Sequence, residues 1–378
     1  MINQSFCILP FIHLHVNEYD QIKTCCYGDP IKQYTTNFDF ETDAALSEIR
    51  KKMLGNIPVA QCKNCYKIEQ HGGESFRQRD TSEWMSKLNL ESIDQVRPAL
   101  IYYDIRNDNT CNLACRICYP GASSQIEKEY RALKWPINPA SRTTTLWETI
   151  DYSNIQKLLV AGGEPTIMLS FQKFLMQAIE HNRTDCELRI ITNGTNLNKQ
   201  ILSLLSKFKS IEFTVSIDGY NQVNRYIRWP SDWPTLVQNI HRLYGITENV
   251  SFNVTVSLYN INCLSELIKF LETEYTDPLI MLNEAVNPAP HAEIAPWNLP
   301  DKTTALADLI SIRSTKTYAK EQDFANRVEY FISRLTDATF SQEKLKRFFA
   351  YNDAVDQHRM IQLKDYLPEL EKYRYSII

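Results

Sequence analysis

The feature that most constrains the fold is the alternation of strand-like and helix-like segments between residues 99 and 300. The predicted strands are Leu100–Ile105, Lys157–Ala161, Glu187–Thr192, Glu212–Ile217, Ser251–Ser257 and Leu279–Asn283. The predicted helices between them are Leu169–Glu180, Lys199–Phe208, Thr235–Tyr244 and Leu264–Glu274. Alternation of this kind indicates repeated βαβ units and a parallel sheet. Six units are too few for a closed eight-stranded barrel, so we predict an α/β fold with a partial, TIM-like (β/α)6 barrel.

Two further regions flank the predicted barrel. The first contains predicted strands at Ile12–Val16 and Gln21–Cys25 and a helix at Ala44–Leu54. Pro98 marks its end, because a residue that precedes proline is disfavoured in a helix. After Pro300 only helices are predicted, at Lys302–Ser311, Ala319–Asp337 and Ser341–Tyr373, the last of them broken. We therefore expect a small α+β module over residues 1–98, the barrel over 99–300 and a helical extension over 301–378.

Composition excludes several classes of protein. The chain has 41 Lys and Arg against 45 Asp and Glu, a net charge of −4, which argues against a coat for nucleic acid or an anionic membrane. No apolar run approaches the roughly 18 residues that a membrane span requires. The N-terminus lacks the basic and apolar regions of a signal peptide. We predict a cytoplasmic protein with no nucleic-acid or membrane partner.

Cysteines are concentrated near the N-terminus, where eight of the ten lie within the first 118 residues. Closely spaced thiols in a cytosolic chain indicate metal binding more than disulfide bonding. Cys111, Cys115 and Cys118 follow the first predicted barrel strand, and the carboxyl ends of barrel strands are where such folds place their chemistry. Three thiolates can hold three irons of a 4Fe–4S cluster and leave the fourth iron open to a small molecule. The alternative is zinc, which usually has paired CxxC motifs and four ligands.

The CxxxCxxC motif after the first strand resembles that of the radical S-adenosylmethionine (SAM) superfamily, whose fold is a partial (β/α)6 barrel. Further motifs follow in the family's order: Gly162-Gly163-Glu164-Pro165 after the second strand, Thr192-Asn193-Gly194 after the third, Ser216-Ile217-Asp218-Gly219 after the fourth, Tyr226-Ile227-Arg228 beyond it, and Asn253 on the fifth. The resemblance implies that the SAM-binding residues are Gly162, Gly163, Glu164, Asn193, Ser216, Asp218, Arg228 and Asn253. One departure is Ile117, which stands where the family usually has an aromatic residue.

The N-terminal cysteines resemble the twitch or SPASM auxiliary-cluster module of radical SAM enzymes, placed here before the barrel. The resemblance implies that Cys7, Cys25, Cys62 and Cys65 hold a second, fully ligated 4Fe–4S cluster. Zinc is the alternative, because CxxC is equally good zinc spacing. Strand alternation would put Cys25 and Cys26 on opposite faces, so that only one is a ligand. We favour Cys25, by analogy with the module's usual position.

The resemblance implies an enzyme that cleaves SAM reductively to a 5′-deoxyadenosyl radical, which abstracts hydrogen from a substrate. The expected substrate is a ribosomally made peptide, with a sugar, nucleoside or amino-acid derivative as the alternative. An electron donor such as flavodoxin or ferredoxin is the implied partner. A non-catalytic Fe–S or zinc scaffold is the rival from another class. Asp353, Asp356 and Arg359 resemble a segment of the same twitch subset, and the sequence does not separate ion pairing from substrate contact there.

Overall fold

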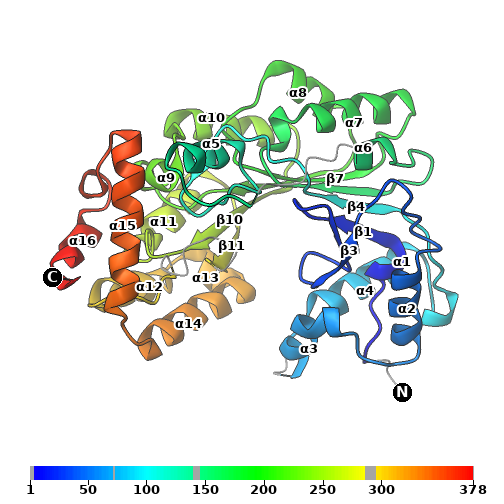
Figure 1. Ribbon diagram of the computed structural model, residues 1–378, viewed down its shortest axis with the longest axis horizontal. Helices are drawn as coiled ribbons and strands as arrows, with labels where there is room; N and C mark the ends of the chain where they lie inside the picture. The colour runs from blue at the N-terminus through cyan, green and yellow to red at the C-terminus, as the bar shows by residue number, and fades with distance from the viewer. Residues whose placement is uncertain (1–3, 71–72, 139–144, 286–294, 378) are drawn as a thin grey trace. The chain divides into compact units, whose positions relative to one another are not determined.

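The computed structural model describes residues 4–70, 73–138, 145–285 and 295–377 (Figure 1). The chain divides into two compact units, each made of segments that are separated in the sequence. The first unit comprises Met1–Thr110, Pro139–Ile190 and Gln200–Ile211, and the second comprises Cys111–Asn138, Ile191–Lys199 and Glu212–Ile378.

The sheet of the first unit has the strand order β7-β6-β4-β1-β2-β3. Its strands are β1 His13–Val16, β2 Gln21–Lys23, β3 Pro30–Gln33, β4 Tyr102–Ile105, β6 Lys157–Val160 and β7 Glu187–Thr192. The pairs β1–β4, β4–β6 and β6–β7 are parallel, whereas β1–β2 and β2–β3 are antiparallel. The N-terminal strands and the first barrel strand therefore share one sheet.

Helices cover both faces of this sheet. They are α1 Leu9–Ile12, α2 Ala44–Leu54, α3 Lys63–Gln70, α4 Phe76–Lys87, α6 Thr145–Glu148, α7 Leu169–Glu180 and α8 Lys199–Leu205. Figure 1 shows α7 on one side of the strands and α4 on the other. Trp84 of α4 stacks on Tyr102 of β4 with ring centroids 5.7 Å apart. Ser75 and Gln78 form a capping box that fixes where α4 begins.

The second unit contains a parallel sheet in which β10 lies between β8 and β11. Its strands are β8 Ile211–Ser216, β10 Val250–Val256 and β11 Leu279–Glu284, and β5 Ala114–Cys115 pairs separately with β9 Arg228–Trp229. Its helices are α5 Ser124–Ala132, α9 Gln222–Ile227, α10 Trp233–Tyr244, α11 Leu264–Glu274, α12 Thr303–Ile312, α13 Lys316–Lys320, α14 Gln322–Asp337, α15 Gln342–Arg359 and α16 Pro368–Glu371. The α/β class and the mostly parallel pairing are confirmed.

Several predicted elements have slightly different bounds in the structure, and two of them need correction. The predicted strand Gln21–Cys25 is too long, because β2 ends at Lys23, opposite Pro30, which has no N–H for the ladder. Cys25 and Cys26 lie in the turn that follows, so strand alternation is the wrong reason for separating them. The helix Ala319–Asp337 is two helices, because Glu321 adopts an extended conformation between α13 and α14. The break predicted within Ser341–Tyr373 is confirmed and falls at Met360, whose φ is 56°. The division into regions at residues 98 and 300 stays a prediction.

Candidate functional site

The three-cysteine loop lies in the second unit and runs from Cys111 to Cys118. The antiparallel pairing of β5 with β9 sets Cys115 opposite Arg228. The Cys115 side chain is buried, and those of Cys111 and Cys118 are half-buried. The Cys118 amide donates to the Cys115 carbonyl at 3.0 Å, which turns the chain tightly between the last two thiols.

The start of α5 fastens this loop. The Ser124 hydroxyl accepts from the Cys111 amide at 3.1 Å and contacts the Cys111 carbonyl at 3.2 Å. The neighbouring Ser123 hydroxyl donates to the Leu113 carbonyl at 2.7 Å and also caps α5. An apolar cluster of Ala114, Ile126 and Tyr130 packs against Cys118. The loop is thus held by α5 through both polar and apolar contacts.

Buried charges surround the thiols. Burial raises the pKa of Cys115, and the Arg228 guanidinium opposes that rise, with a smaller opposing effect from Arg359. Burial also raises the pKa of Cys118, reinforced by the other two cysteines of the loop. Positive charge beside a thiol favours the thiolate, which is the form that binds metal. Three such thiols on one loop, with arginines beside them, fit the ligand set of an iron–sulfur cluster that has three protein ligands.

Arg228 and Asp218, both expected at the SAM site, are paired with each other. Arg228 Nε lies 2.6 Å from Asp218 Oδ2, and Asp218 is fully buried. The amide of Thr255 donates to Asp218 Oδ1 at 2.7 Å. Burial raises the pKa of Asp218, and Arg228 opposes the rise. The pair therefore joins the end of β8 to β9 and β10 next to the cysteine loop.

Of the remaining predicted residues of the second unit, Asn193 follows β7, Ser216 ends β8 and Asn253 lies in the middle of β10. The Asn193 amide donates to Asn112 Oδ1 at 3.0 Å and lies 3.9 Å from Cys111 Sγ. Ser216 and Asn253 are register partners on β8 and β10. Asn193 is the residue of this set that the structure brings against the cysteine loop itself.

The Gly-Gly-Glu-Pro motif lies in the first unit, after β6. Gly163 N donates to the Asp108 carbonyl at 2.8 Å, and Glu164 N donates to the Thr110 carbonyl at 2.7 Å. A Cβ on Gly163 would lie 2.1 Å from the Thr110 oxygen, so only glycine fits there. Gly162 has a φ of +109°, and a Cβ added there would lie 2.7 Å from the Asp108 carbonyl oxygen. The glycine pair therefore packs against the segment that leads directly into Cys111.

Glu164 is fully buried, and its carboxylate also serves the local backbone. Glu164 Oε1 accepts from the Thr166 amide at 3.2 Å and from the Thr166 hydroxyl at 2.7 Å. The residue thus caps the short 3-10 helix Pro165–Ile167. This geometry shows that the Glu164 carboxylate accepts hydrogen bonds. Its expected contact with SAM stays a prediction.

Four of the five N-terminal cysteines, those expected to hold the auxiliary cluster, line one small cavity of the first unit. Its walls are formed by Cys7, Leu9, Thr24, Cys25, Tyr27, Gly28, Cys62, Cys65 and Arg77. Burial raises the pKa of Cys25 to about 12 and that of Cys62 to about 11. Cys26 is exposed and is absent from the cavity wall. Among the described residues, no three His, Cys, Asp or Glu side chains surround a point as the ligands of a single metal ion do.

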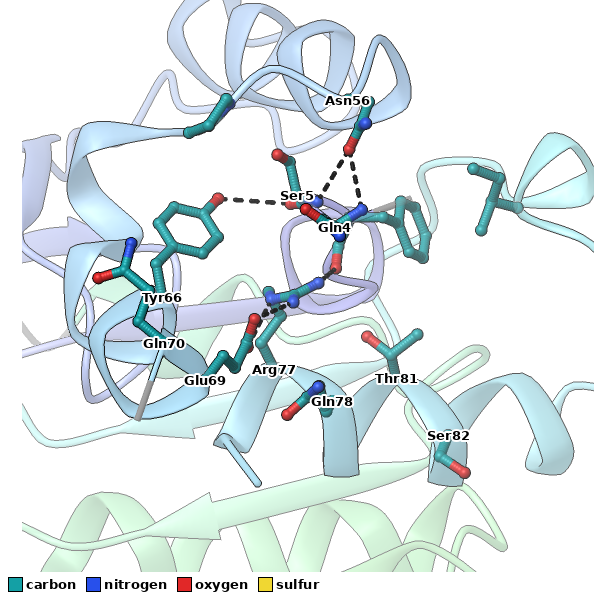
Figure 2. A pocket seen from close by; sticks show the side chains of 13 residues that line it. Gln4, Ser5, Asn56, Tyr66, Glu69, Gln70, Arg77, Gln78, Thr81 and Ser82 are labelled. Carbon is teal, nitrogen blue, oxygen red and sulfur yellow. Dashed lines mark hydrogen bonds and ion pairs between the residues drawn. The ribbon is translucent and has the colours of Figure 1, made fainter. Parts of the chain in front are cut away.

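A groove of about 1050 Å³ adjoins this cavity, and Figure 2 shows the side chains that line it. Arg77, which lines both, donates from Nη1 to the Phe6 carbonyl at 2.6 Å and from Nε to Glu69 at 3.0 Å. Asn56 accepts from the amide of Gln4 at 2.9 Å and from that of Ser5 at 3.2 Å. Arg77 is therefore part of the packing between the cysteine cavity and the groove.

Sequence reasoning missed a buried charge cluster on β1 and β4. His15 Nδ1 lies 2.8 Å from Asp104 Oδ2, and Arg106 Nε donates to Asp104 Oδ1 at 2.8 Å. His15 and Asp104 face each other only because β1 pairs with β4. That pairing joins segments 89 residues apart, and no local pattern indicates it.

The structure so far defines a mostly parallel α/β protein with a three-thiol loop after a strand. The family model described as Radical SAM superfamily matches residues 109–271. The chain therefore carries a radical SAM superfamily domain over this segment, which is 163 of its 378 residues.

The individual similarities are more distant. The chain is 21% identical over 137 residues to the sporulation killing factor maturation protein SkfB of Bacillus subtilis (strain 168), covering 36% of this chain and 30% of SkfB. It thus spans less than a third of that curated relative. Among solved structures, anSMEcpe with bound AdoMet is 16% identical, with a TM-score of 0.42, covering 60% of this chain and 62% of that one. Streptococcus suis SuiB bound to precursor peptide SuiA is 14% identical, with a TM-score of 0.42, covering 84% and 70%.

None of the helices in the described part of the chain combines the length and apolar character that crossing a membrane demands.

Proposed function

We propose that this chain is a radical SAM enzyme whose cluster is held by Cys111, Cys115 and Cys118. The observation that carries the proposal is the loop itself: three clustered thiols beside two buried arginines, within the segment that matches the family. With a 4Fe–4S cluster bound there, the chemistry supplied is one-electron cleavage of SAM to methionine and a 5′-deoxyadenosyl radical that takes hydrogen from a substrate.

The protein's own part is to bind and orient SAM and the substrate and to exclude water, since the bond-breaking chemistry belongs to the cofactor. We assign SAM binding to Gly162, Gly163, Glu164, Asn193, Ser216, Asp218, Arg228 and Asn253. The burial of Glu164 supports this, because a carboxylate attracts an ammonium more strongly in the low-dielectric interior than at the surface. The ion pair with Asp218 fixes the Arg228 guanidinium beside Cys115.

We further propose that Cys7, Cys25, Cys62 and Cys65 hold a second 4Fe–4S cluster. Their common cavity supports this, and the exposed position of Cys26 favours Cys25 as the fourth ligand. Four thiolates ligate such a cluster fully and leave no iron for SAM. Zinc is the competing occupant, and metal analysis separates the two.

A peptide is the proposed substrate. The support is the similarity to SkfB, which is described as a maturation protein for a killing factor. Small-molecule substrates remain the alternative. The electron donor is proposed to be a flavodoxin or ferredoxin, and the location to be the cytoplasm.

The experiment is an anaerobic reconstitution followed by iron analysis, visible absorbance and an assay for 5′-deoxyadenosine. About eight irons are expected from two cubane clusters. The triple variant with Cys111, Cys115 and Cys118 changed to Ala should keep about four irons and lose SAM cleavage. Retained cleavage in that variant would refute the assignment. A colourless protein that contains zinc would instead support the non-catalytic scaffold.

A further inference from the structure

The last long helix, α15, contacts the cysteine loop through buried polar side chains. Arg116, which lies between Cys115 and Cys118, has no exposed surface. Its Nη1 donates to Asn352 Oδ1 at 2.8 Å, and its Nη2 pairs with Asp356, both on α15. Its Nε donates to the Tyr226 carbonyl at 3.0 Å. A side chain of the loop is thus held by residues more than 230 positions further along the chain.

Aromatic residues complete this network. The Arg116 guanidinium lies 3.7 Å from the centroid of the Tyr226 ring, a cation–π contact. The Tyr226 hydroxyl lies 3.1 Å from both oxygens of Asp356, and the Tyr259 hydroxyl donates to Asn352 Oδ1 at 3.1 Å. Each nitrogen of the buried Arg116 guanidinium therefore has a hydrogen-bond partner, which is the condition under which such a charge is tolerated.

A second arginine makes the reverse connection, from the helix to the loop. Arg359, at the end of α15, donates from Nη2 to the Ala114 carbonyl at 2.7 Å. Its Nε and Nη2 also donate to the two oxygens of Glu129 on α5, at 2.7 and 2.8 Å. Ala114 directly precedes Cys115, and Arg116 directly follows it. Arg359 therefore holds the backbone before Cys115, and the contacts of the Arg116 side chain hold the residue after it.

We propose that α15 is a positioning element for the cysteine loop, with Arg116 and Arg359 as positioning residues. The inference rests on the proposed function in taking this loop as the cluster site. Without Asp356 the buried Arg116 guanidinium would keep only neutral partners, Asn352 and Tyr226, and would lack a counter-charge, so the loop must open to let it reach water. The thiols then lose their fixed spacing before the rest of the unit unfolds. The helix that does this lies outside the segment that matches the family model.

The test measures how fast the thiols of the iron-free full-length protein react, so that the result does not depend on cluster loading. Wild type and Asp356→Asn are treated with iodoacetamide, and the alkylation rate of each cysteine is followed by mass spectrometry. Cys115 and Cys118 should react about 10- to 150-fold faster in the variant, the range for losing one charge-assisted hydrogen bond. Cys263, on another part of the same unit, should keep its rate.

The matched control is Asp353→Asn on the same helix. Asp353 pairs with Arg374 at the surface, at 2.8 Å, and has no part in the network. Its removal should leave all alkylation rates within about twofold, as for other exposed ion pairs. Equal rates for the loop thiols in wild type, Asp353→Asn and Asp356→Asn would overturn the proposal. Faster reaction of all thiols together would also overturn it, because the role would then be general stability.

A second variant, Arg359→Lys, covers the case in which Asp356→Asn does not fold. Lysine keeps the charge but cannot serve Glu129 and Ala114 in the same fork geometry, so the loop thiols should again react faster. On reconstitution, both variants should lose the iron of the loop while keeping the iron of Cys7, Cys25, Cys62 and Cys65. If wild type itself takes up no iron at the loop, the proposed function fails, and the alkylation rates still decide whether α15 positions the loop.

Discussion

Replacement of Gly163 by Ala tests whether the glycine pair exists to let the chain pass close to the cysteine loop. The added Cβ would lie 2.1 Å from the Thr110 oxygen, 2.6 Å from the Thr110 carbon and 2.7 Å from the Asn109 carbon. All three are backbone atoms, so no side chain can swing aside. Reaching even a tight contact of about 3 Å requires a backbone shift of about 1 Å, and overpacking of this kind typically costs about 1–3 kcal/mol. That shift would displace the residues immediately before Cys111.

The assay is urea unfolding of the iron-free protein, followed by iron uptake on reconstitution. We expect the free energy of unfolding to fall by about 1–3 kcal/mol and the iron of the loop to fall with it. The control is Gly245→Ala at the end of α10, where φ is −70° and the nearest atom to the added Cβ is the Arg242 oxygen at 3.2 Å. That variant should stay within about 0.5 kcal/mol of wild type. Wild-type stability and iron content in Gly163→Ala would show that close backbone packing does not explain this glycine.

Three more predictions follow from buried groups. Arg228→Met leaves Asp218 buried without its ion partner and should lower the free energy of unfolding by about 3–5 kcal/mol. Most of this loss should be recovered in the double variant that also has Asp218→Leu. If nothing is recovered, the broken ion pair is not the cause of the loss. Burial lowers the pKa of His13 to about 4, so unfolding takes up a proton between pH 6.5 and 4 and stability must fall as the pH falls. From pH 6.5 to 5 the loss should be about 1.6 kcal/mol larger in wild type than in His13→Phe, measured by denaturant unfolding; parallel pH profiles would contradict it. Cys25→Ser should lower the iron content by about four while Cys26→Ser leaves it unchanged, and the reverse result would exchange the two assignments.

Much of the fold follows from local pattern. Helices α2, α7 and α11 begin and end at the residues predicted, because their apolar spacing and flanking residues are all contained in one short segment. The six predicted barrel strands are present for the same reason. The parallel pairing of β1 with β4 was not predicted, since it depends on which distant strand completes the sheet edge. The end of β2 depended on Pro30 of the facing strand, which is likewise non-local.

The candidate site likewise has some features that follow from local sequence and others that depend on distant residues. The cysteine spacing and the Gly-Gly pair are short-range signals, and the structure gives each a geometric reason. The partners of Arg116 and Arg359 could not be read from the sequence, because ion pairing and substrate contact use the same residue types. The sequence singled out Asp356 and Arg359 without their roles, and the structure assigns both to buried pairs.

The pairing of Arg116 with Asp356 also has a consequence for synthesis of the chain. The two residues are 240 positions apart, so at about 5–20 residues per second the ribosome makes the partner roughly 10 to 50 seconds after the loop. During that interval the Arg116 guanidinium has no carboxylate with which to form an ion pair, so it cannot be buried and must stay hydrated. The three-cysteine loop, which we propose as the cluster site, is therefore finished only after α15 has left the ribosome, and iron delivered earlier would meet three thiols whose positions are not yet fixed.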